Sequence, residues 1–384
     1  MEAIIEFDEM IRPISLVNRL ISIWPLELNR NSSFESRMRP AHRVLMFILV
    51  GILSVSATAD IIRHWGDMNE VTECALIATA FYLSMLRLVV YTSHKRDLEY
   101  AVNTVRVDWS ESCEADIIVL REKCLFGFQL AKYFIVSVVM ALGAFMISPA
   151  LQIIFLGTDE RILPFRGFFF QNQTNTPYYE CLYVFDVIAG ALGGSTISGA
   201  TSLNLMLVTH GAAKFSLVRK KLQALKSNDA NVDRDLEKCV RLHQEAILFA
   251  DRAEDIINVL ALGQFVISTG LVCFAGFQIT SMIEDKGRMM KYVSFINSAI
   301  LELFLFSYSG NQLITESEAV GESFYQSDWV GGNYMQNMRI LMLRSINPSR
   351  ITAGKFYDMS LKSFSSVLST SFTYFTVLQA VNED

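Results

Sequence analysis

Long apolar runs alternate with polar connections along the whole chain. A run of about 20 apolar residues is long enough to cross a bilayer as an α-helix, and seven runs reach that length. The connections leave no room for a separate soluble core. The pattern therefore predicts an all-α polytopic membrane protein with seven transmembrane helices, at 44–62, 71–91, 130–156, 182–208, 255–282, 292–313 and 358–380.

Basic residues in the connections predict the orientation of these spans. The segment before the first span and the connections after the second, fourth and sixth spans hold most of the 33 Lys and Arg residues. Because basic connections stay inside the cell, we expect a cytoplasmic amino terminus and an extracellular carboxyl terminus. The sequon Asn172-Gln173-Thr174 then lies in an extracellular connection, where Asn172 is a candidate for glycosylation.

The cytoplasmic connections themselves have helical patterns. Apolar residues in 234–257 follow a spacing of three and four, which is typical of an amphipathic helix that runs into the fifth span. The segment 212–226 extends the fourth span in the same way, and a further helix is expected at 333–346. These helices can pack within one subunit or against copies from neighbouring subunits. The expected organisation is a cytoplasmic segment 1–43, transmembrane helices one to four in 44–208, cytoplasmic extensions in 209–254, transmembrane helices five and six in 255–313, an anchor helix region in 314–357, and the seventh helix with its tail in 358–384.

Composition and motifs exclude several functions. Charged residues make up 19% of the chain and hydrophobic residues 52%, which is a membrane composition. The net charge of −6 offers no basic surface for nucleic acid. The six cysteines are far apart, the five histidines are scattered, and no catalytic or phosphate-binding motif is present. We therefore expect no enzyme activity, no catalytic residue, no metal site and no cofactor.

A few polar residues lie within the predicted spans. Arg87 is expected to extend to the lipid headgroups, whereas Glu302 lies midway along the sixth span and must face protein or water. Asp186, near an extracellular end, either contacts a ligand or is solvated at the membrane boundary. The fourth span is rich in glycine and other small residues over 189–200, which allows either close helix packing or a cavity.

Several stretches, taken in order, resemble the insect odorant receptors. They are Leu163-Pro-Phe-Arg-Gly-Phe168, Cys239-Val-Arg-Leu-His-Gln-Glu-Ala-Ile-Leu-Phe249, Phe304-Leu-Phe-Ser-Tyr-Ser-Gly310, Ile351-Thr-Ala-Gly-Lys-Phe356 and Ser371-Phe-Thr-Tyr-Phe-Thr-Val-Leu378. The likeness covers most of 160–380. The long insertion between helices four and five that marks the olfactory co-receptor is missing, so the chain is similar to a tuning subunit.

The resemblance implies an odorant-gated, nonselective cation channel. Such a channel is a heterotetramer of tuning subunits and olfactory co-receptor in the plasma membrane of an olfactory neuron dendrite. It binds a small volatile odorant in the outer half of each helix bundle, contacts membrane lipid, and conducts cations through one central pore lined by the seventh span. A G-protein-coupled chemoreceptor or a secondary transporter is the alternative, although the former needs the opposite orientation and the latter paired broken helices.

The resemblance and the predicted orientation together give three sets of candidate residues. The odorant site is expected at Ile77, Phe81, Tyr82, Phe145, Ser148, Ala189, Gly193, Tyr292, Phe295 and Ile296. The gate is expected near the extracellular end of the seventh span, at Thr376, Val377, Gln379, Ala380 and Val381. The subunit interface is expected at His243, Ile247, Tyr325, Trp329, Met338 and Met342, unless these side chains pack wholly within one subunit.

Overall fold

A computed structural model describes residues 2–25, 33–156, 161–169, 173–227, 229, 231–282, 286–329 and 335–383. Within these ranges the chain is almost wholly helical. The helices are α1 (Glu2–Leu20), α2 (Ser33–Arg63), α3 (Met68–Ser93), α4 (Lys95–Glu111), α5 (Glu114–Leu156), α6 (Tyr178–Gln223), α7 (Val232–Ser281), α8 (Lys286–Tyr325), α9 (Met335–Ser345) and α10 (Leu361–Glu383). Two short antiparallel strands, β1 (Thr352–Ala353) and β2 (Tyr357–Asp358), precede α10.

Six described helices are long and apolar enough to cross a membrane, namely α2, α3, α5, α6, α7 and α8. Each carries one of the first six predicted spans. The seventh predicted span falls on α10, in which frequent Ser and Thr residues lower the hydropathy. The structure is therefore that of a helical membrane protein with six candidate spans and further helices around them.

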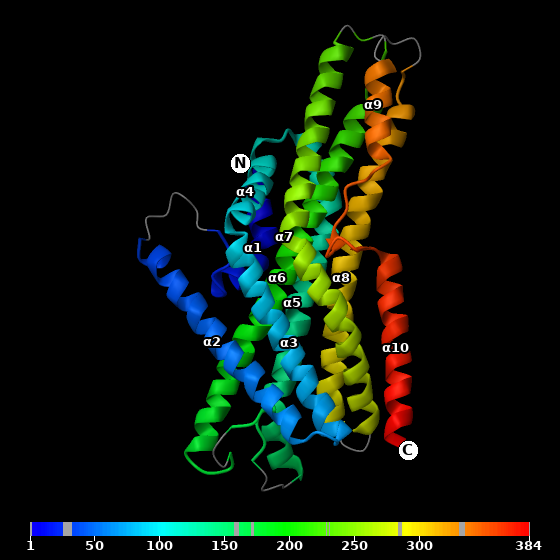
Figure 1. Cartoon of the computed structure of the whole chain (residues 1–384). Helices are drawn as coiled ribbons and strands as arrows, with labels where there is room; N and C mark the ends of the chain where they lie inside the picture. The colour runs from blue at the N-terminus through cyan, green and yellow to red at the C-terminus, as the bar shows by residue number, and fades with distance from the viewer. Residues whose placement is uncertain are drawn as a thin grey trace.

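Helix α6 forms the centre of the bundle. Its residues 198–218 are all buried, because α5, α7 and α8 pack around it and α1 packs against one side. Figure 1 shows α1 and α4 beside the upper part of the bundle, and α10 at its edge, where it contacts α7 and α8.

The two ends of the bundle differ. Figure 1 shows α9 at one end, which we call the α9 end, and the last residues of α10 at the opposite end, which we call the α10 end. Helix α6 continues without a break to Gln223 at the α9 end, where α7 begins at Val232. The connection between α2 and α3 lies at the α10 end.

A hairpin fixes the start of α10 against the bundle. Gly354 turns it with a φ of +59°, a left-handed conformation that glycine adopts without strain. Thr352 and Lys355 both bind the Glu254 carboxylate of α7. Gly310 of α8 lies so close to the Met359 carbonyl that a Cβ there would overlap it. The hairpin thus connects α10 to two of the spanning helices.

Candidate ligand-binding site

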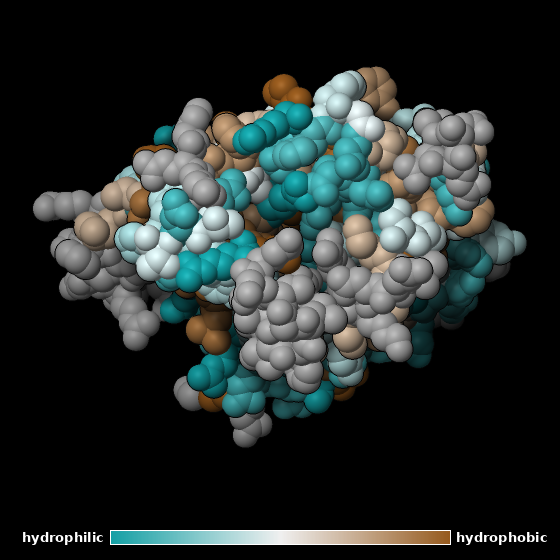
Figure 2. All heavy atoms as spheres, turned by 90° about the horizontal axis from the view of Figure 1, so that it is seen from below, coloured by the Kyte–Doolittle hydropathy of each residue, from teal (hydrophilic) through white to brown (hydrophobic). Residues whose placement is uncertain are grey.

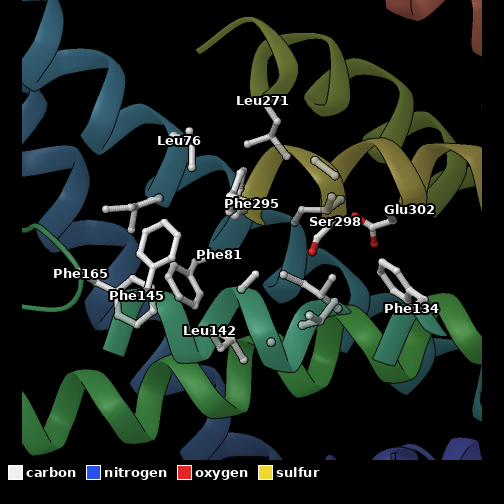
Figure 3. Close-up of a pocket in the computed structure, with 18 residues that line it drawn as sticks. Leu76, Phe81, Phe134, Leu142, Phe145, Phe165, Leu271, Phe295, Ser298 and Glu302 are labelled. Carbon is white, nitrogen blue, oxygen red and sulfur yellow. The ribbon is translucent and has the colours of Figure 1, made fainter. Parts of the chain in front are cut away.

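The bundle encloses an apolar cavity toward its α10 end. Five helices, α3, α5, α6, α7 and α8, and the segment 161–169 contribute to its wall. Its volume is about 80 Å³. Figure 3 shows side chains from several helices pointing into the common space. The lining residues are Leu76, Ile77, Ala80, Phe81, Leu83, Phe134, Val138, Ala141, Leu142, Phe145, Phe165, Gly194, Ile197, Leu271, Phe295, Ser298, Ala299 and Glu302.

Aromatic rings close one end of this cavity. Phe165, which comes from the 161–169 segment rather than from a helix, stacks on Phe145 with ring centroids 5.5 Å apart. Its edge contacts Phe81 at a centroid distance of 5.4 Å. Figure 3 shows the three rings grouped together. Such offset and edge-to-face pairs are favourable for aromatic rings. The ring of Phe165 therefore fills this end of the cavity, and we call it the plug.

The small residues of α6 make room for these rings. A Cβ added at Gly190 would overlap Phe165, and one added at Gly193 would overlap Phe81. A Cβ at Gly194 would overlap Leu142 of α5. The two interpretations of the glycine-rich span are therefore both correct, because α6 packs closely against side chains that in turn form the cavity wall.

Polar contacts hold the 161–169 segment over the cavity. The Phe165 backbone N–H donates to the Asp186 carboxylate at 3.2 Å, and the Phe168 N–H donates to the Ser56 carbonyl at 2.9 Å. Arg166 donates to Asp60 at 2.9 Å and also pairs with Glu70. Asp186 is thus buried as a hydrogen-bond acceptor rather than solvated at a membrane boundary.

Arg166 lies in a polar hollow outside the plug, lined by side chains of both charges. Burial alone would lower the pKa of its guanidinium, but the hydrogen bond to Asp60 and the nearby carboxylates of Glu70 and Glu73 raise it instead. Lys291 of α8 also borders this hollow. Figure 2, which views the α10 end, shows hydrophilic residues over much of this face. The ring of Phe165 therefore separates the apolar cavity from the polar hollow that Arg166 and Lys291 border.

An ion pair lies at the other end of the cavity. Arg87 of α3 is 1% exposed, and its Nη2 atom is 2.6 Å from Oε1 of Glu302. The prediction that Arg87 reaches the headgroups was wrong, because Glu302, Gln264 and the surrounding helices bind it inside the bundle. Thr201 donates to Oε1 of Glu302 at 2.7 Å, and Gln264 donates to Oε2 at 3.1 Å. Four helices meet at this carboxylate.

The predicted odorant-site residues occupy different positions around the cavity. Ile77, Phe81, Phe145 and Phe295 line it. Gly193 lies behind Phe81, and Ser148 borders the polar hollow instead. Ala189, Tyr292 and Ile296 pack in the surrounding hydrophobic cluster. Tyr82 is 42% exposed, and its hydroxyl pairs with Thr58 at 3.1 Å, away from the cavity.

Several lining residues were not among the predicted ones. Phe165 belongs to a stretch that carries the family resemblance, but its sequence does not reveal that the segment folds back into the bundle. Ser298 lies three residues, about one helical turn, after the predicted Phe295, so a stripe continued along the helix would have included it. Glu302 continues the same stripe.

The predicted gate residues lie on an exposed helix. Val377 is 57% exposed, and Thr376 and Ala380 are also exposed. Gln379 is half-buried. The side chain of Val381 and the whole of Asn172 lie outside the described residues.

The predicted interface residues are divided between interior and surface. His243 is buried against Phe215, with ring centroids 5.9 Å apart, whereas Tyr325 is exposed. Trp329, Ile247 and Met342 are half-buried against the main hydrophobic cluster. The side chain of Met338 is outside the described part of the chain. The outward apolar face of α9 carries Ile340 and Leu343 instead, the latter 65% exposed.

The described residues contain no group of three His, Cys, Asp or Glu side chains that could hold a metal ion. The site instead consists of an apolar cavity, the ring of Phe165 at one end and the Arg87–Glu302 ion pair at the other. An apolar cavity with few polar groups suits binding of a small apolar molecule.

Comparisons with known proteins identify the family of this chain. The family model described as "7tm Odorant receptor" matches residues 67–372. Odorant receptor 13a of Drosophila melanogaster is 24% identical, with 95% of this chain and 94% of that protein covered. Odorant receptor 10 of Aedes albopictus is 23% identical, covering 96% and 98%.

A solved structure has the same fold. It is the insect olfactory receptor OR5 from Machilis hrabei in complex with eugenol, with a TM-score of 0.80, 16% identity, and coverage of 98% of this chain and 99% of that one. The same receptor without eugenol matches equally well. Because the family model spans most of the chain, this protein belongs to the 7tm odorant receptor family, a family of chemoreceptors rather than enzymes.

Proposed function

We propose that this chain is the odorant-binding tuning subunit of an odorant-gated, nonselective cation channel. It assembles with the olfactory co-receptor as a heterotetramer in the plasma membrane of an olfactory neuron dendrite. Its seven spans, counting α10, run from a cytoplasmic amino terminus to an extracellular carboxyl terminus. In this orientation the α10 end faces outside the cell, and the cavity lies in the outer half of the bilayer.

The main support for odorant binding is the apolar cavity inside the helix bundle. Volatile molecules are small and mostly apolar, so they gain affinity chiefly from burial of their surface. The cavity is small, and Phe81, Phe145 and Phe165 occupy much of the available space at one end. Ligands that exceed this space require these rings to move. The structural relative from Machilis hrabei was solved in complex with the small molecule eugenol, which supports binding of a small molecule within this fold.

The exposed surface of α10 supports a role in the pore. A single subunit leaves Ser366, Ser369, Thr373 and Thr376 exposed on this helix, at the three- and four-residue spacing of one helix face. Hydroxyl groups on a membrane helix favour contact with water. Val377, one position further, supplies an apolar side chain that can block ions by dewetting a narrow passage.

The outward face of α9 supports assembly through the α9 end. Ile340, Leu343 and Ile346 are large apolar side chains that a single subunit leaves exposed. Their burial against a neighbouring subunit removes this apolar surface from water. Helix α9 packs on α8, which also lines the cavity, so one helix connects the ligand site to the proposed interface.

Co-expression with an olfactory co-receptor and recording of currents across an odorant panel tests the proposal. We expect odorant-evoked cation currents that cells with the co-receptor alone do not give, and that persist when G-protein signalling is blocked. A reporter at the carboxyl terminus should be accessible from outside the cell. A cytoplasmic reporter, or currents that require G proteins, would contradict the channel function and favour a G-protein-coupled receptor.

A further inference from the structure

The cavity has a polar end and an apolar end. Among the described lining residues, only Ser298 and Glu302 have polar side chains. Both belong to α8 and lie one helical turn apart, so they point in a similar direction. Figure 3 shows them on one ribbon, at the end of the cavity away from the ring of Phe165. A ligand that fills the cavity therefore meets aromatic rings at one end and two oxygen-bearing groups at the other.

Both polar groups are available mainly as hydrogen-bond acceptors. Ser298 donates its hydroxyl proton to the Ser294 carbonyl at 3.2 Å or shares it with the Ser137 hydroxyl at 2.7 Å, which leaves its oxygen lone pairs as the remaining capacity. An ionised carboxylate can only accept, and Glu302 receives three donors, from Arg87, Thr201 and Gln264. A carboxylate has about four acceptor positions, so one remains.

We infer that Ser298 and Glu302 select ligands that carry a hydrogen-bond donor, namely apolar molecules with one hydroxyl group. The hydroxyl lies at the polar end, and the hydrocarbon or aromatic body extends toward Phe165. An ether, ester or ketone of the same shape has no proton to donate, so its oxygen faces acceptors without a partner. A site built to hydrogen-bond a hydroxyl rejects the analogue that lacks the donor, because a buried acceptor position then faces an ether or carbonyl oxygen instead of a donor.

This inference rests on the proposed function, so its test separates the two. The receptor is expressed with the co-receptor, and half-maximal concentrations are measured for matched sets with the same body. Each set contains a primary alcohol or phenol, its methyl ether and the parent hydrocarbon, and the panel also includes ketones, esters and amines. We expect the alcohol of each activating set to act at a concentration about tenfold lower than its methyl ether.

The Ser298→Ala variant removes one acceptor with little change in volume. We expect it to raise the half-maximal concentration of the alcohols about tenfold and to leave the ethers nearly unchanged. Ser137→Ala is the matched control, because it removes the partner of the same interhelical hydrogen bond without lining the cavity. Surface labelling reports whether each variant reaches the membrane.

The outcomes are distinct. Equal potency of alcohols and ethers on the unmodified receptor overturns this inference and leaves the proposed function intact. An equal loss of potency of the alcohols in Ser137→Ala and Ser298→Ala also overturns it, because the Ser298 hydroxyl would then act through helix packing. A receptor that reaches the surface with its co-receptor and responds to no compound in the panel contradicts the proposed function itself.

Discussion

Arg87 and Glu302 form an ion pair inside the helix bundle, with 2.6 Å between Nη2 and Oε1. Both side chains are almost fully buried, and they join α3 to α8 beside the ligand cavity. Removal of charges from water is costly, and mutual attraction offsets the cost only when further hydrogen bonds satisfy both groups. Thr201 and Gln264 supply such bonds to Glu302, and Gln264 also accepts a bond from Nη2 of Arg87. Nη1 of Arg87 is buried without a hydrogen-bond partner among the described residues, so Glu302 supplies most of its compensation. The polar end of the cavity is therefore also a junction of four helices.

The Glu302→Gln substitution should destabilise the subunit by about 3–5 kcal/mol, because it leaves the Arg87 guanidinium buried without a counter-charge. The measurement is the thermal unfolding midpoint in detergent, together with the amount of protein at the cell surface. The double substitution Arg87→Leu with Glu302→Leu should recover a large part of the loss, since it removes both charges. Equal stability of Glu302→Gln and the unmodified protein would show that the pair contributes little.

Six of the seven predicted spans fall on helices that are long and apolar enough to cross a membrane, because these apolar runs exceed 18 residues. The sequence predicts the cavity only in part. Phe81 and Phe145 follow from their depth on α3 and α5, but Phe165 depends on the path of a loop that has no periodic pattern. Arg87 was misplaced because a single charge near a span end does not reveal a partner 215 residues away on another helix.

The Gly193→Leu substitution should abolish odorant responses while surface expression is retained. A side chain at this position overlaps the ring of Phe81, and this ring then has to move into the cavity. Evoked currents and surface labelling measure the two effects. Gly143→Leu on α5 is the control, because a Cβ there meets no atom within 4 Å. Unchanged odorant sensitivity of Gly193→Leu would mean that the space beside Phe81 is not the ligand site.

The Arg166→Gln substitution should weaken the retention of Phe165 in the cavity. Arg166 is held charged by Asp60 and Glu70, and the ion pairs are partly exposed, so we expect a modest effect, a rise of about threefold to tenfold in half-maximal odorant concentration. Concentration–response curves measure it. Arg161→Gln in the same segment removes a more exposed ion pair, with Glu180, and should have little effect. An equal effect of both variants would argue for a general loss of charge at this surface.

Introduction of a charge on the outward face of α9 should disrupt assembly. Leu343→Glu is expected to lower recovery of complexes with the co-receptor about tenfold while the subunit itself remains folded, because Leu343 contacts solvent in the single chain. Met342→Glu should lower both assembly and stability, since Met342 also packs against the main hydrophobic cluster. Co-purification and thermal unfolding separate the two effects. Asn347→Glu, at an exposed position after α9, serves as the charge control.

A polar residue at Val377 should favour a hydrated pore without ligand. If the exposed face of α10 surrounds the central passage, the apolar side chains near its end form a ring that excludes water in the closed channel. Val377→Asn places an amide in that ring and lowers the free energy of the wet state, so the closed population falls. We expect a higher basal current, or altered relative cation permeability, when the variant is paired with the co-receptor.

The matched control for this variant is Val184→Asn. Val184 is exposed to a similar degree, but it lies on α6 and not on α10. The same chemical change there should leave basal current and permeability unchanged, which separates an effect on the pore from a general effect of a polar group on an apolar surface. The co-receptor lines part of the same passage, so the change in basal current is expected to be partial. If Val377→Asn and Ala380→Asn both leave leak current, permeability and block by large cations as they are, α10 does not line the pore.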